Sequence, residues 1–129
     1  MLYHIIRFAF EERIPAQERD EVIRQMNGFA NIAGVIDARV GIESAGPDQE
    51  FTHALVVTME GEEQYEGYQA HPTHVEAALY GVPKLSKMQM VDIVMDPAPG
   101  VQERLAAINA RLGAEYFSGL GAHMEAIAS

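Results

Sequence analysis

The order of apolar and polar positions divides the first 95 residues into strands and helices. Three short runs are rich in β-branched and aromatic residues, which favours buried strands, and a fourth run alternates as a half-buried strand does. Longer segments between them repeat apolar residues at helical spacing. The predicted order is a strand at 2–10, a helix from Pro15 to Gly34, strands at 35–43 and 51–59 around a turn at 44–49, helices at 61–70 and 72–80, and a strand at 85–95.

The order strand, helix, strand, strand, helix, strand predicts an α+β protomer with the ferredoxin-like βαββαβ fold. In this fold two crossovers place the helices on one face of an antiparallel sheet. We expect the first and third strands to lie side by side and, because each crossover returns the chain in the same sense, to run parallel.

The second face of the predicted sheet is also apolar. In the first strand Tyr3 and Ile5 oppose Leu2 and Ile6, and the last strand is apolar on both sides, with Met88, Met90 and Met95 assigned to a dimer core. An exposed apolar sheet exceeds the patch size that a monomer usually tolerates. We therefore expect a homodimer in which two sheets pack into an α/β barrel.

The last 32 residues form a separate helical segment. Residues 96–100 carry two prolines and a glycine, which end the strand, and Val101, Leu105, Ile108 and Leu112 then recur at helical spacing. We expect a domain at 1–97 and a helical C-terminal extension of the same domain at 98–129.

The composition narrows the possible partners. A formal net charge of −10 repels phosphate backbones and anionic membranes, and the basic residues form no run. The absence of cysteine excludes disulfides, thiolate nucleophiles and cysteine-ligated zinc. No segment approaches the roughly 20 apolar residues of a membrane span, and the N-terminus lacks the features of a leader peptide. We expect a cytoplasmic protein that binds neither nucleic acid nor membrane.

The remaining candidates for chemistry are histidines and one tyrosine. The motif YQAHPTH at 68–74 places Tyr68, His71 and His74 at spacings of three around a helix break at Pro72. His4 and His53 are each the third residue of a strand, so parallel pairing would make them neighbours. The second helix returns toward that end of the sheet, and we expect the four histidines and the phenol to converge beneath the helices.

Five stretches resemble the stress-responsive dimeric α/β-barrel domain family (Dabb). They are LYHIIRFAF, NIAGVIDARVG, THALVVTM, YQAHPTH and VDIVMD, and the resemblance covers about residues 2–96. It implies a ferredoxin-like protomer that dimerises through its sheet. One characterised member type, the plant olivetolic acid cyclase, resembles this chain at His4, His53, Tyr68 and His74, and there the motif tyrosine and last histidine carry an aldol cyclisation.

These residues suggest acid–base chemistry. We expect His74 as general base and Tyr68 as hydrogen-bond donor to a developing enolate, with His4, His53 and His71 lining the substrate pocket. Such chemistry requires no cofactor, and we expect neither a cofactor nor a metal. The competing interpretations are buried structural histidines and a metal site of His71 and His74 with His4 or His53, within reach of Glu76 or Asp92.

The sequence therefore predicts a cofactor-free enzyme or ligand binder. If catalytic, it moves a proton beside the carbonyl of an aromatic, polyketide-like or lactone small molecule, as a cyclase, isomerase or lyase. One alternative is a non-catalytic stress-response dimer. Another is a cofactor-free monooxygenase on the same architecture.

Overall fold

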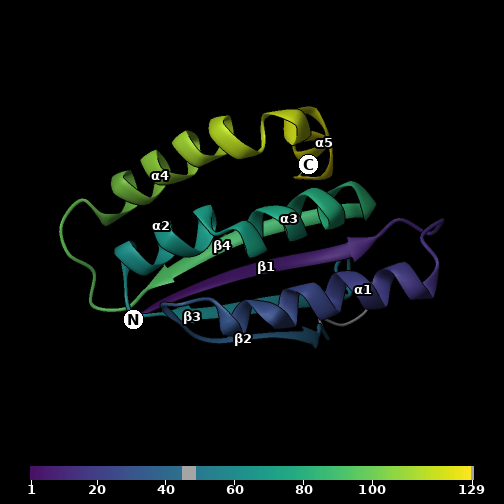
Figure 1. The fold of residues 1–129 in the computed structure, drawn as a ribbon, viewed down its shortest axis with the longest axis horizontal. Coiled ribbons are helices and arrows are strands. Elements are labelled where there is room, and N and C mark those ends of the chain that lie inside the picture. Colours follow the sequence, from purple (N-terminus) through teal and green to yellow (C-terminus); the bar gives the residue numbers. More distant parts are fainter. Residues whose placement is uncertain (45–48, 129) are drawn as a thin grey trace.

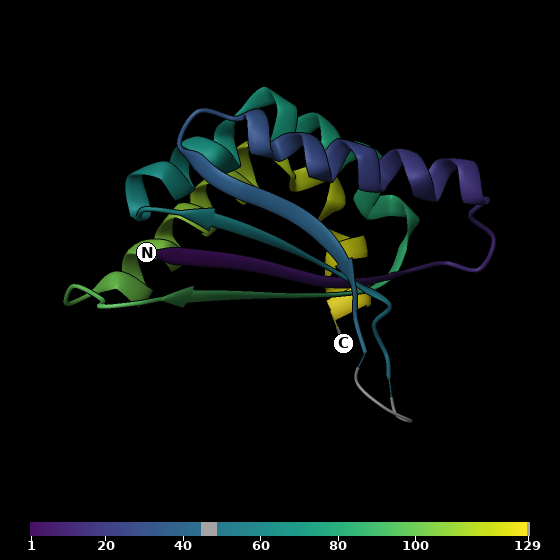
Figure 2. The same cartoon turned by 90° about the horizontal axis from the view of Figure 1, so that it is seen from below.

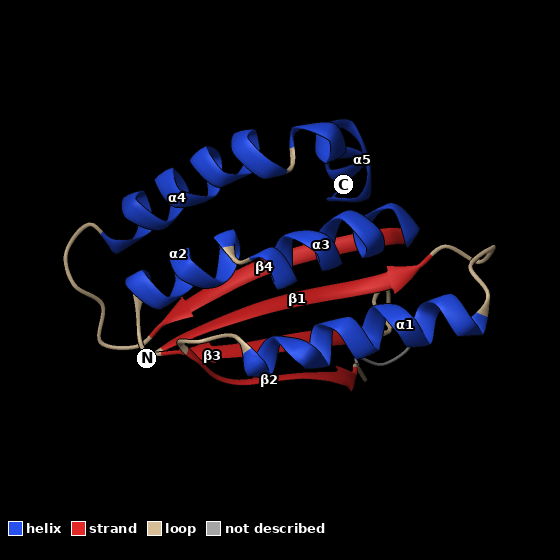
Figure 3. Cartoon of the chain, in the orientation of Figure 1, coloured by secondary structure: helices blue, strands red, loops and turns tan. Residues whose placement is uncertain are grey.

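A computed structural model describes residues 1–44 and 49–128, and its helices lie against a four-stranded sheet (Figures 1 and 3). The predicted ferredoxin-like order is confirmed, and most of the turn predicted at 44–49 lies outside the described residues. The elements are β1 (Leu2–Phe10), α1 (Ala16–Asn27), η1 (Gly28–Asn31), β2 (Val35–Ile42), β3 (His53–Met59), α2 (Glu62–Ala70), α3 (Pro72–Gly81), η2 (Val82–Lys84), β4 (Leu85–Val94), α4 (Val101–Tyr116), η3 (Ser118–Leu120) and α5 (Gly121–Ala128).

The sheet has the strand order β2-β3-β1-β4, and every neighbouring pair is antiparallel. The prediction that β1 and β3 are adjacent is confirmed, but the prediction that they run parallel is wrong. A helical crossover does keep β2 in the direction of β1, but the direct connection from β2 then reverses the chain before β3. Strand β3 therefore runs against β1.

This reversal separates the two strand histidines. His4 pairs with Val57, whereas His53 pairs with Phe8. The two histidines are thus four positions apart along the paired strands, which corresponds to about 13 Å at the usual rise of a strand. Their predicted proximity is wrong for this reason, although both residues do lie on the helix-covered face.

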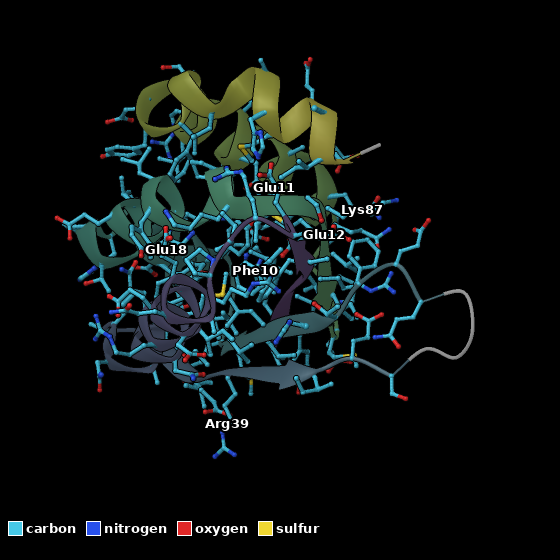
Figure 4. All side chains as sticks on the ribbon, turned by 90° about the vertical axis from the view of Figure 1, so that its right-hand side faces the viewer. Phe10, Glu11, Glu12, Glu18, Arg39 and Lys87 are labelled. Carbon is cyan, nitrogen blue, oxygen red and sulfur yellow. The ribbon has the colours of Figure 1, made fainter. Side chains whose placement is uncertain are left out.

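The helix layer covers the face of β1 that carries Leu2, His4 and Phe8, each at most 1% exposed. Val22 of α1 packs into the same core. In β2 a register shift between Val35 and Asp37 breaks the regular alternation. Strand β2 is an edge strand, and Figure 4 shows Arg39 pointing from it away from the body of the molecule, which suits a solvent-exposed edge.

The other face of the sheet is apolar and accessible. Figure 2 shows α1, α2 and α3 on one side of the sheet, and Val56, Val91 and Ile93 on the opposite face are 38 to 41% exposed. Met88 and Met90 do not belong to this face. They pair with Phe8 and Ile6 of β1 and so face the helices, which corrects their assignment to a dimer core.

The C-terminal segment adds a further layer beside α2 and α3 (Figure 1). Helix α4 runs along α2 in the same direction, with Arg104 Nη2 2.6 Å from Glu62 Oε1 and Arg111 paired with Glu66. Helix α5 packs on β4, and the His123 ring lies 3.1 Å from the carbonyl oxygen of Val82. Over the described residues, no helix combines the length and apolarity needed to cross a bilayer.

Candidate functional site

A cavity of about 390 Å³ lies between the sheet, α3 and the C-terminal helices. Small-molecule sites typically have volumes of ~300–1,000 Å³, so this space suits a small ligand. The sheet contributes His4 and Met90, and α3 contributes His74. The opposite wall comes from the C-terminal segment, including Leu112 and Phe117.

His4 is held by a carboxylate on the neighbouring strand. The register pairs His4 of β1 directly with Asp92 of β4, and His4 Nδ1 lies 2.6 Å from Asp92 Oδ1. A carboxylate can only accept a hydrogen bond, so His4 Nδ1 carries a proton and donates the hydrogen bond to Asp92. The other ring nitrogen, Nε2, is buried and has no hydrogen-bond partner among the described residues. His4 thus presents a polar atom that only a ligand or water could satisfy.

The carboxylate of Asp92 is itself held by a buried phenol. The hydroxyl of Tyr65 lies 2.9 Å from Asp92 Oδ2 and 2.9 Å from Asn109 Oδ1, and its single proton can serve one acceptor at a time. Burial, and then the negative charge of Asp92, raise the pKa of Tyr65. The phenol therefore keeps its proton and fixes Asp92 in place. Through Asn109 this network reaches the C-terminal helix α4.

His74 lies in the first turn of α3 and is 7% exposed. Its Nδ1 lies 2.9 Å from the carbonyl oxygen of Gln69 and donates to it, which leaves Nε2 with a lone pair. Burial lowers the pKa of His74 to about 4, although the bond to Gln69 opposes this shift. His74 is therefore neutral at physiological pH and accepts hydrogen bonds through Nε2.

Tyr68 packs behind the two histidines. Its ring centroid lies 4.6 Å from that of His74, 5.6 Å from that of His4 and 5.6 Å from that of Phe29. The side chain is fully buried, and its hydroxyl has no hydrogen-bond partner in the described part of the chain. Burial raises the pKa of this phenol, so it stays protonated. Tyr68 thus adds a second unpaired polar atom beside His4.

The two other candidate histidines lie outside this cluster. His53 stacks on Phe8 at 5.3 Å between ring centroids, and its Nδ1 bonds to Thr52 Oγ1 at 2.7 Å. His71 caps α3, because its Nδ1 accepts from the backbone N–H of Thr73 at 3.1 Å. The structure therefore brings together His4, Tyr68 and His74 but neither His53 nor His71. Across residues 1–44 and 49–128, no three histidine, aspartate or glutamate side chains converge as metal ligands would.

From the sequence, Asp92 was a candidate only as a metal ligand, and neither Tyr65 nor Asn109 was a candidate partner of the His4 site. The available signal was Asp92, the single carboxylate of its strand, which is flanked by Val91 and Ile93 and has the parity of the helix-covered face. A buried carboxylate needs a partner, and a histidine at the matching position of the next strand could have been sought. Asn109 carries no such signal, because an amide in an amphipathic helix usually faces solvent.

Comparison with known proteins identifies the domain. The family model of the stress responsive A/B barrel domain matches residues 2–95. The chain is 29% identical over 97 residues, 69% of this chain and 84% of the relative, to the stress-response A/B barrel domain-containing protein HS1 of Arabidopsis thaliana. A dimeric ferredoxin-like protein of unknown function from Thermobifida fusca has a TM-score of 0.64 and 22% identity, covering 73% of this chain and 90% of that one.

A further solved structure with the same fold is the hydroxynitrile lyase from Passiflora edulis. It has a TM-score of 0.66 and 18% identity, and the match covers 76% of this chain and 96% of that one. At this identity the likeness shows the fold alone. Helices α4 and α5 lie beyond the residues that the family model matches.

Proposed function

We propose that this chain, which belongs to the stress responsive A/B barrel domain family and whose own cavity between sheet and helices is lined by His4, is a cofactor-free enzyme acting on small, largely apolar molecules. His4 takes a proton either from the substrate carbon next to a carbonyl or from a substrate hydroxyl. One observation carries this proposal. His4 Nδ1 is bound to Asp92, while Nε2 is buried, unpaired within the described residues and part of a residue that lines the cavity.

The pair of His4 and Asp92 is suited to proton abstraction. When Nε2 takes a proton, the imidazole becomes cationic, and the adjacent carboxylate stabilises this charge and holds the ring orientation. An unpaired buried nitrogen costs about 1–3 kcal/mol of stability. That Nε2 of His4 stays unpaired despite this cost supports a role for this atom in contacting a ligand.

His74 lines the cavity beside His4, and Tyr68 packs directly behind both histidines. The low pKa of His74 makes it a weak proton acceptor near neutrality, so the role of general base passes from His74 to His4. His74 Nε2 instead accepts a hydrogen bond from a substrate hydroxyl. The Tyr68 hydroxyl is the available donor for an oxygen that gains negative charge.

Two reactions fit this arrangement with atoms and charges balanced. In enolisation the α-carbon loses a proton to His4 Nε2, and the bonding electrons move to the carbonyl oxygen, which gives an enolate. In hydroxynitrile cleavage the hydroxyl proton passes to Nε2, the bond to the nitrile carbon breaks, cyanide leaves with its electron pair, and the imidazolium returns the proton to cyanide. Both reactions begin with the transfer of a substrate proton to His4 Nε2, from carbon in the first and from oxygen in the second.

The test measures both reactions with unmodified protein. Deuterium incorporation at the α-carbon of neutral aryl ketones in D₂O is followed by NMR, and aldehyde release from an aromatic hydroxynitrile is followed by absorbance. We expect His4→Gln to lower either rate by about 10²-fold or more. His53→Gln is the matched control, because His53 occupies the same face of the sheet outside the cavity, and its rate should equal that of the unmodified protein.

The same experiment separates the alternatives. Binding of these compounds without any conversion would favour a non-catalytic stress-response dimer. Oxygen consumption coupled to loss of the ketone would favour a cofactor-free monooxygenase. Equal rates in the unmodified protein and His4→Gln would contradict the role given to His4.

We also propose that two copies of the chain pair through the outer face of the sheet. Val56, Val91 and Ile93 on this face are 38 to 41% exposed, and a homodimer would remove them from water. A solved relative is described as dimeric, which supports self-association. The proposed cavity lies on the other face and stays open in such a dimer.

A further inference from the structure

The C-terminal extension forms one wall of the cavity. Leu112 in α4, Phe117 at the end of that helix and Met124 in α5 all line it, and none lies within the residues that the family model matches. Phe117 also contacts the site directly, since its ring centroid lies 5.8 Å from that of His74 in an edge-to-face arrangement. The family domain alone would leave this side of His74 uncovered.

This wall is attached to the domain at several points. Arg104 and Arg111 of α4 pair with Glu62 and Glu66 of α2 on the surface. Between these pairs, Asn109 Oδ1 lies 2.9 Å from the Tyr65 hydroxyl that holds Asp92. The extension is thus tied to the network that orients His4, and its position is fixed relative to the reacting groups.

The side chains around the cavity favour an aromatic ligand. Met88 and Met90 of β4 and Phe117 and Met124 of the extension all line the cavity. Thioether sulfur atoms and aromatic rings both make favourable contacts with aromatic rings. Among the residues that the structure describes, no lysine, arginine, aspartate or glutamate lines this cavity, and the net charge of the chain is −10. The described lining therefore offers no charge that would compensate a charged ligand.

We propose that the C-terminal extension, residues 98–129, is the substrate-recognition wall and that it selects neutral aromatic carbonyl compounds. The aromatic ring lies among Met88, Met90, Phe117 and Met124, and the carbon beside the carbonyl faces His4 Nε2. This inference names the substrate class of the proposed function and rests on it for the chemistry. The binding step itself can be tested without any turnover.

Gly113 offers a way to fill the cavity without damaging the fold. It lines the cavity from α4, and a Cβ added there meets no heavy atom within 4 Å. A side chain at this position therefore starts without a clash, and a phenyl ring is large enough to occupy the adjoining cavity. It also replaces a glycine inside a helix, which favours the helical state. Gly113→Phe should block the cavity and melt no lower than the unmodified protein.

The probe is prodan, a neutral naphthyl ketone whose emission shifts to the blue in apolar surroundings. We expect the full-length chain to bind prodan, and Gly113→Phe and Phe117→Ala to weaken that binding by about tenfold or more, a 1.4 kcal/mol change. Gly67→Phe is the matched control, because Gly67 is an exposed helical glycine of α2 with the same free space, and it should bind as the unmodified protein does. Naphthoate, an anion with the same ring system, should fail to displace prodan.

The inference is overturned if the unmodified protein does not bind prodan, if naphthoate competes equally well, or if Gly113→Phe and Phe117→Ala bind as Gly67→Phe does. Loss of prodan binding in the two cavity variants together with absent proton exchange would keep the recognition wall and reject the proposed enzyme. Proton exchange that depends on His4 but is unaffected in both cavity variants would keep the enzyme and reject the recognition wall.

Discussion

His4 and Asp92 face each other across β1 and β4, with Nδ1 2.6 Å from Oδ1, although 88 positions separate them in the chain. The backbone hydrogen bonds of the sheet set this register, so the pair is formed before any ligand arrives. A preformed donor and acceptor avoids the cost of reorganisation during proton transfer. The proposed chemistry rests on this pair.

Replacing the carboxylate tests its contribution. Asp92→Asn keeps the shape of the side chain but removes the charge that stabilises the imidazolium, and we expect the deuterium-exchange rate to fall by about 10²-fold. Asp96→Asn is the control, because Asp96 is exposed just beyond the strand, and asparagine accepts its positive φ of 53°. If both variants exchange at the rate of the unmodified protein, Asp92 has no catalytic part.

The two buried tyrosines should respond oppositely to loss of the hydroxyl. Tyr68→Phe removes an unpaired buried group, so we expect the free energy of unfolding to rise by about 1 kcal/mol. Tyr65→Phe removes a hydroxyl that bonds to Asp92, and the free energy should fall by about 1 kcal/mol or more. Urea denaturation measures both. Equal destabilisation would mean that the Tyr68 hydroxyl has a partner in solution.

His74 should make the stability depend on pH. Burial lowers its pKa from 6.5 to about 4 in the folded protein, so the unfolded chain takes up this proton first as the pH falls. The contribution of His74 to the free energy of unfolding is therefore fully present above about pH 6.5. It is lost as the pH falls toward 4, which lowers the stability by up to roughly 3 kcal/mol. Urea denaturation across this range should show a smaller decline for His74→Gln.

His123→Gln provides the matched control for that measurement. His123 also bonds to a backbone carbonyl, that of Val82, but lies in α5. The variant keeps His74 in place, so its decline of stability with acid should match that of the unmodified protein. A His74→Gln profile indistinguishable from the control would show that His74 is not buried as a neutral imidazole.

The outer face of the sheet should control the oligomeric state. Ile93→Glu places a charge on this face, and burying an unpaired carboxylate between two sheets is costly, so we expect the dimer to dissociate. Leu79→Glu serves as control, since Leu79 is 46% exposed on α3, in the helix layer on the opposite side of the sheet. Sedimentation velocity distinguishes the species. A monomeric unmodified protein, or a dimeric Ile93→Glu variant, would contradict the proposed interface.

The fold could be predicted because periodicity and turn residues are local properties. The strand at 2–10, the break before Pro72 and the end of β4 near Asp96 all follow from residues close in sequence. The predicted direction of β3 relative to β1 is wrong because it does not include the reversal of the chain between β2 and β3. That single error also placed His53 beside His4.

The site could be predicted only in part. His4, Tyr68 and His74 do meet, since two of them share one motif and the third lies on the inner face of the central strand pair. Asp92 and Asn109 depend on the register of β4 and on the packing of α4, which are tertiary properties. The cavity wall lies in a segment outside the family pattern, and local periodicity showed a helix there without showing what it covers.

The most direct test of the account is the protonation pattern of His4 and His74. Two-bond ¹⁵N–¹H correlation spectra of protein labelled at histidine, recorded near pH 8, where an ordinary histidine is neutral, report which ring nitrogen carries the proton. We predict protonated Nδ1 and bare Nε2 on both residues, and a shift of His4 Nε2 when prodan binds. Protonated Nε2 on His4, or no response of that nitrogen to prodan, would contradict the proposed site.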